Sequence, residues 1–130
     1  MIQFYTFKFF FIRLFFGNDF QNKFLFDHHF FSNRYYLHKS ASEKHMANIL
    51  NISIDALNKI TIYNYHLKFD ELCEKYRFAH FWDEFTNPIN SELPINSIID
   101  SAGFASTVDF SNLMSNYKEE SKYIIKKKFL

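Results

Sequence analysis

The side chains of this sequence that could bind a metal or attack a substrate are its six histidines and its single cysteine. The histidines stand at positions 28, 29, 38, 45, 66 and 80. No pair of them has the i, i+4 spacing, with a carboxylate beside it, that places two zinc ligands on one face of a helix. Cys73 alone makes no intramolecular disulfide, and it fits packing better than reaction. We therefore expect no metal site and no cofactor.

Sequence motifs of the common enzyme classes are also missing. The sequence has no nucleophile elbow, phosphate-binding loop, dinucleotide-binding glycines or paired catalytic carboxylates. It contains 2 glycines and 2 prolines, against 19 phenylalanines and 8 tyrosines. Because so few residues break a helix, long helices are expected. The composition thus favours an all-α chain. Because the motifs are missing, we expect no catalytic residues, and an enzyme is the least supported class.

Serine residues mark the starts of several expected helices. Ser40 precedes Glu43 by three residues, the pairing in which a hydroxyl and a carboxylate cap the start of a helix reciprocally. A helix over residues 42–51 follows, and Ser53 caps a second helix that turns Leu57 inward. The pattern predicts a helix, a short turn and a second helix.

The stretch AGFASTVDFSNLM, residues 102–114, repeats that plan near the other end of the chain. Gly103 ends a helix, because a residue without Cβ adopts the left-handed conformation at little cost. Phe104 is expected to fold back onto that helix, while Ser106 and Asp109 cap the next one. The inward face of this last helix consists of Phe110, Leu113 and Met114.

A longer amphipathic stretch separates the two helix pairs. The residues KFDELCEKYRFAHFWDEF predict a helix over 68–85, about 27 Å in length. Phe81 and Trp82 are expected to fill the core between the two helix pairs, and Arg77 to form a structural ion pair or a brace between the pairs. Both prolines follow in TNPINSELP and end the helix.

Residues 1–39 differ from the rest of the chain in charge and composition. They hold five basic and two acidic residues, a balance of +3, whereas residues 40–130 hold ten and twelve, a balance of −2. The opening MIQFYTFKFFFIRLFF is apolar, but Lys8 and Arg13 interrupt it, and a membrane span needs about 20 apolar residues. Three interpretations stay open: an aromatic helix anchored at a membrane surface, the end of a truncated membrane segment, or a mis-assigned start.

With these elements in place, residues 40–130 resemble the DNA-binding domain of AraC/XylS-type transcription regulators. The first helix pair matches the family at Ala47, Ser53, Leu57 and Lys59, and the second at Ile95, Ile98, Gly103, Phe104, Ser106, Phe110, Ser121 and Lys126. The resemblance implies an all-α fold with two helix-turn-helix subdomains joined by a long linker helix. The aromatic-rich extension of residues 1–39 precedes them.

The resemblance implies a bacterial, cytoplasmic transcription regulator that binds double-stranded DNA, with RNA polymerase as a further partner. In residues 1–39 we expect no complete effector-sensing domain. In this motif the second helix enters the major groove with its first turns, and two such helices lie about 34 Å apart. The residues expected to read bases are Asp55, Asn58, Lys59, Thr107, Val108, Ser111 and Asn112. Those expected to contact phosphate are Ser53, Ser106 and Lys126. The two asparagine amides could pair with adenine, and the valine could touch a thymine methyl group.

Departures from the family remove positive charge from the expected DNA-binding face. Asn112 stands where an arginine is common, and Ser115 and Asn116 stand where lysines are common. Together with the balance of −2, this leaves a second function open: a degenerate or truncated module that acts through protein contacts or is inactive. Membrane association through residues 1–31, at the inner membrane, is the alternative to a cytoplasmic location.

Overall fold

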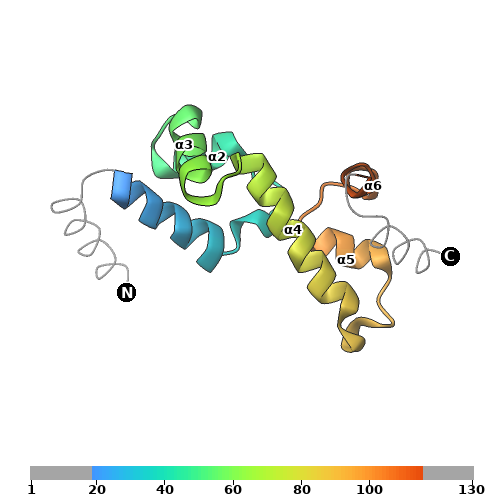
Figure 1. The fold of residues 1–130 in the computed structure, drawn as a ribbon. Helices are drawn as coiled ribbons and strands as arrows, with labels where there is room; N and C mark the ends of the chain where they lie inside the picture. The colour runs from blue at the N-terminus through green and yellow to red at the C-terminus, as the bar shows by residue number, and fades with distance from the viewer. Residues whose placement is uncertain (1–18, 116–130) are drawn as a thin grey trace. The chain divides into compact units, whose positions relative to one another are not determined.

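The structure is a computed structural model in which residues 19–115 are described (Figure 1). All regular structure between residues 19 and 115 is helical, and no strand occurs there. The all-α class predicted from the sequence is therefore confirmed. The described residues fall into two compact units: 19–35 with 41–72, called the first unit, and 36–40 with 73–115, called the second unit.

The described part of the aromatic extension is helical and belongs to the first unit. Residues 19–27 form a helix, blue in Figure 1, that continues as a turn of π-helix, η1 (His28–Ser32). Phe26 and Phe30 are fully buried and stack with their ring centroids 5.1 Å apart. Both rings also meet the ring of Phe69 edge to face, at 6.3 and 6.0 Å. Aromatic burial of this kind fastens the extension to the helices that follow.

The boundary that we placed after residue 39 does not coincide with the division into units, because these buried rings join residues 19–35 to the first helix pair. Residues 1–18, on which the membrane interpretations depend, lie outside the described residues. Among residues 19–115, no helix combines the length and the apolar character needed to cross a membrane.

The first helix pair consists of α2 (Glu43–Leu50) and α3 (Ile54–Tyr65). The N-cap of α2 is Ser42, whose Oγ accepts a hydrogen bond from His45 N at 3.0 Å. The prediction that Ser40 caps this helix was therefore wrong. Helical backbone begins directly after Ser42, which is itself extended, so only this serine can reach the third amide of the helix.

The second unit takes most of α4 and the second helix pair. Its elements are α4 (Phe69–Thr86) from Cys73 onward, η3 (Pro88–Asn90), α5 (Ile95–Ser101) and α6 (Thr107–Met114). Eight buried side chains form its core: Phe78, Phe81, Ile98, Ile99, Ala102, Phe104, Phe110 and Met114. Trp82 packs against them and is partly buried. The predicted bounds of the long helix are confirmed to within one residue, as is the core position of Phe81.

The turn between α5 and α6 has the form expected from its glycine. Gly103 lies in the left-handed region with φ of +89°, and Phe104 is buried in the core of the second unit. A Cβ atom at Gly103 would come within 2.7 Å of Tyr36 O and 2.8 Å of Leu37 O. Glycine is therefore required here both by the backbone angle and by the close approach of residues 36–40.

Within the second unit, residues 36–40 are held in place by side chains of α4 and α5. Arg77 of α4 donates from Nε to Tyr36 O at 2.6 Å and from an Nη atom to His38 O at 3.1 Å. Lys39 forms an ion pair with Asp100 of α5. These hydrogen bonds of Arg77 thus go to backbone carbonyl groups of its own unit, so they are neither the ion pair nor the brace between helix pairs that the sequence predicted.

Candidate nucleic-acid interface

The first predicted reading helix, α3, begins at a capped end. Ser53 has an extended backbone, and its Oγ accepts a hydrogen bond from Ala56 N at 3.1 Å. The side chains of Ile54, Asp55 and Lys59 are exposed around the first turns. Because Asp55 and Lys59 are four residues apart, their opposite charges lie on the same face of the helix.

Asn58 faces the interior of the first unit, unlike its neighbour Lys59. Its Nδ2 donates to Glu43 Oε2 and to Ile54 O, each at 3.2 Å, and its Oδ1 accepts from Phe69 N at 2.9 Å. A bidentate contact with adenine uses the same amide oxygen and nitrogen. In the structure this amide is engaged within the protein, so a contact with adenine would require Asn58 to give up these bonds.

The second predicted reading helix, α6, begins in the same way as α3. Ser106 has an extended backbone, and its Oγ accepts a hydrogen bond from Asp109 N at 3.0 Å. The side chains of Val108, Ser111 and Asn112 are exposed, and that of Val108 is 67% exposed. The start of α6 therefore presents one methyl-bearing side chain and one amide beside the exposed carboxylate of Asp109, with no basic residue.

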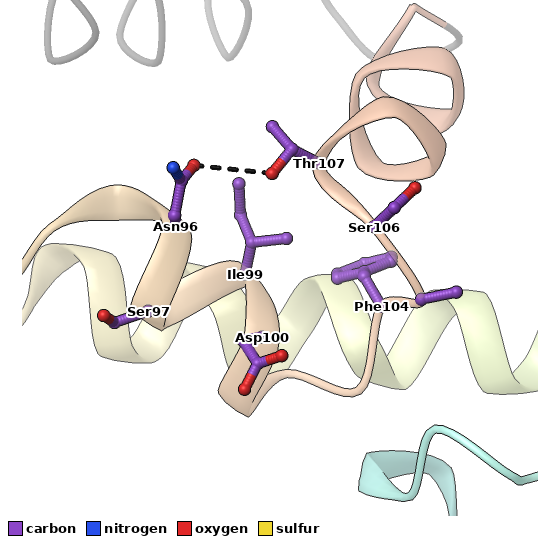
Figure 2. A pocket seen from close by; sticks show the side chains of 8 residues that line it. Asn96, Ser97, Ile99, Asp100, Phe104, Ser106 and Thr107 are labelled. Carbon is purple, nitrogen blue, oxygen red and sulfur yellow. Dashed lines mark hydrogen bonds between the residues drawn. The ribbon is translucent and has the colours of Figure 1, made fainter.

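An open pocket of about 440 Å³ lies between α5 and the start of α6 (Figure 2). It is lined by Asn96, Ser97, Ile99, Asp100, Phe104, Ala105, Ser106 and Thr107. Figure 2 shows Thr107 and Asn96 facing each other, and Thr107 Oγ1 donates to Asn96 Oδ1 at 3.4 Å. The lining has one charged residue, Asp100, whose carboxylate pairs with Lys39. This chemistry does not suit an anionic ligand.

The two exposed faces carry little positive charge. Lys59 is the one basic residue of α3, and α6 has none. Each helix has an aspartate in its first turn, Asp55 in α3 and Asp109 in α6. A carboxylate there interacts favourably with the helix dipole, and it repels a phosphate group from the same place. Lys126, the third predicted phosphate contact, lies outside the described residues.

The serine caps lead to a prediction about stability. Changing Ser106 to alanine is expected to lower the free energy of unfolding by about 1 kcal/mol, because Asp109 N loses its partner. Ser53→Ala should have a similar effect through Ala56 N. Ser111→Ala, at an exposed position inside α6, is the control and should change stability by less than about 0.5 kcal/mol. Urea unfolding measures all three, and equal stability of the cap and control variants would contradict the prediction.

An exposed apolar patch near the end of α3 was not found from the sequence. It consists of Tyr63, which is 84% exposed, and Ile62, which is 46% exposed. The inward stripe of the same helix is marked by Leu57 and Thr61, both fully buried. Comparing each apolar position with this stripe would have revealed the patch, because helical periodicity fixes which residues share a face.

The histidines and the cysteine do not gather into a site among the described residues. In the part of the chain from residue 19 to residue 115, no three His, Cys, Asp or Glu side chains gather in a group that could hold a metal ion. Cys73 is buried. Burial, and then the neighbouring His28, lower the pKa of His29, which favours its neutral form.

Comparisons of the chain with models of known protein families, with curated proteins and with solved structures find no match.

Proposed function

We propose that the chain is a DNA-binding module of a transcription regulator, similar to the AraC/XylS type, with α3 and α6 as its reading helices. The observation that carries the proposal is the repetition of one local arrangement. In each unit a short helix and a short turn lead to a second helix that begins at a serine cap, at Ser53 and at Ser106. Each second helix turns an apolar side chain inward, Leu57 or Phe110, and exposes its first turns.

The chemistry of the α6 face favours A·T base pairs. An exposed valine or threonine methyl group suits the methyl group of thymine, and an asparagine amide suits adenine. Val108 and Asn112 are four residues apart and both exposed, so they lie on the same face of α6. Guanine is read most often by arginine or lysine, and α6 contains neither.

The α3 face contributes contacts of another kind. Lys59 supplies a positive charge for a phosphate oxygen or a guanine, and the exposed Ile54, five residues earlier, supplies a separate apolar contact. Asp55, four residues before Lys59, reduces the net charge of this face to zero. We therefore infer that the module neutralises few phosphates and that much of its specificity comes from base contacts. A cytoplasmic location and RNA polymerase as a partner follow from this function.

Selection of bound duplexes from a random pool, repeated at several salt concentrations, tests the proposal. The expected result is an A·T-rich preference at one half-site and a shallow salt dependence, because the logarithm of the affinity falls by about 0.9 per neutralised phosphate for each decade of salt. Replacing thymine with uracil at the preferred position should weaken binding about fourfold, the factor for loss of a contact worth about 0.8 kcal/mol. In Val108→Ala the same replacement should have little effect.

A second candidate function is binding to another protein through the α3 surface. The specific observation in its favour is the exposure of Tyr63 and Ile62 beside a face with one lysine and one aspartate. An exposed tyrosine is enriched at protein interfaces. Absence of DNA binding in the selection, or binding with no sequence preference and no salt dependence, would favour this candidate over the first.

A further inference from the structure

Asn58 is hydrogen-bonded to three different helices of the first unit. Its Nδ2 donates to Glu43 Oε2 on α2 and to Ile54 O in the first turn of α3, each at 3.2 Å. Its Oδ1 accepts from Phe69 N, the first amide of α4, at 2.9 Å. Its own carbonyl oxygen accepts from Thr61 Oγ1, on a side chain that is fully buried. One residue therefore connects α2, α3 and α4.

The chemistry of the amide explains why asparagine occupies this position. Asn58 offers a donor toward the Glu43 carboxylate and an acceptor toward a backbone amide, and both are needed at once. An aspartate would place a second carboxylate against Glu43. An alanine would leave Phe69 N, one of the amides that a helix start cannot satisfy internally, without this partner.

We propose that Asn58 is the positioning residue of the reading helix α3, which it holds between α2 and the start of α4. The part that concerns DNA rests on the proposed function. Lys59 is the next residue, and successive side chains on a helix point about 100° apart, so fixing Asn58 inward fixes Lys59 outward. A helix fixed in this way loses less freedom when it binds DNA.

A double-mutant cycle between Asn58 and Glu43 tests the connection without DNA. Asn58→Asp is expected to raise the unfolding equilibrium constant at least tenfold, because two carboxylates then face each other. A tenfold change corresponds to a loss of about 1.4 kcal/mol in the free energy of unfolding. Glu43→Gln alone should be nearly neutral, since the glutamine oxygen still accepts from Asn58. The double variant should recover a good part of the loss, because the glutamine amide now donates to the new carboxylate. Urea unfolding followed by circular dichroism measures the cycle.

Asn64→Asp provides the matched control on the same helix. Asn64 Nδ2 donates to Ile60 O at 2.8 Å, the same i−4 contact that Asn58 makes with Ile54 O. Asn64→Asp should therefore show no dependence on Glu43→Gln. Hydrogen exchange of the Phe69 amide gives a second measurement: it should speed up in Asn58→Ala and stay unchanged in Asn64→Ala. The proposal is overturned if Glu43→Gln fails to rescue Asn58→Asp and the Phe69 amide keeps its protection.

The DNA measurement separates a positioning role from direct contact. Asn58→Ala should weaken binding at the selected site several-fold with the salt dependence unchanged, whereas Lys59→Ala should reduce the salt slope by about 1. A changed base preference in Asn58→Ala would show that the residue reads a base, which would overturn the positioning role. If the unaltered chain binds no DNA, the proposed function fails, while the cycle and the amide exchange still decide whether Asn58 holds the three helices together.

Discussion

Replacing Gly103 with alanine is expected to lower the free energy of unfolding by about 3 kcal/mol. Two costs combine at this position. The backbone angle φ is +89°, which side-chain-bearing residues rarely adopt. The new methyl group would also come within 2.7 Å of Tyr36 O and 2.9 Å of Leu37 C, which are backbone atoms that cannot rotate away.

The close contact between the new methyl group and the backbone of residues 36 and 37 would be relieved if residues 36–40 moved away. That movement would break other interactions. Arg77 holds the carbonyl groups of Tyr36 and His38, and Lys39 is paired with Asp100. The hydrogen bonds from the guanidinium are charge-assisted and contribute more than neutral ones. The ion pair is exposed on both sides and contributes at most about 1 kcal/mol. Residues 36–40 are therefore held mainly by Arg77, and the strain stays at position 103.

Gly103→Asn separates the two costs. Asparagine tolerates the left-handed region better than alanine, but its Cβ meets the same backbone atoms. Equal losses in the two variants would assign the effect to the close approach, and a clearly smaller loss for asparagine would assign it to the backbone angle. Urea unfolding followed by the fluorescence of Trp82, the single tryptophan, reports on this unit because Trp82 packs against its core. A loss below about 1 kcal/mol for alanine would contradict the prediction.

The parts of the fold that were predicted from the sequence are those fixed by local interactions. Gly103 and Ser106 determine a helix end and a helix start within a few residues, so their roles follow from residue type and spacing. The long helix follows from its apolar periodicity and from the prolines beyond it. At the first helix pair two serines were available, and only the three-dimensional start of α2 distinguishes Ser42 from Ser40.

The parts that were not predicted depend on contacts between distant residues. Asn58 was expected to face outward because the resemblance places it on a reading helix. In the structure its side-chain oxygen accepts a hydrogen bond from the backbone N–H of Phe69, eleven residues later. Likewise, the burial of Phe26 and Phe30 depends on where Phe69 lies. Helical spacing shows which residues share one face of a helix, but it does not show which face meets the core. The core of the first unit includes residues from the extension, so the buried face could not be chosen from the helix pair alone.

The second large effect is expected from Phe110→Ala, which should lower the free energy of unfolding by about 3 to 5 kcal/mol. Phe110 is 1% exposed, and its ring centroid lies 4.6 Å from that of Phe81 and 5.2 Å from that of Phe104. Truncation would remove these ring contacts and leave a cavity among side chains from α4, the turn and α6. Cavities of this kind collapse only partly, because the surrounding helices cannot move closer without losing other contacts.

Val108→Ala, two residues earlier on α6, is the matched control. Its side chain is 67% exposed, so the change should alter stability by less than about 0.5 kcal/mol. The two variants also separate the roles of the two faces of α6. Val108→Ala is expected to affect the discrimination of thymine from uracil, whereas Phe110→Ala is expected to affect folding. Trp82 fluorescence during urea unfolding measures the stability difference. If the two variants were equally stable, the inner and outer faces of α6 would have to be reassigned, and the proposed DNA-reading face would no longer follow from the fold.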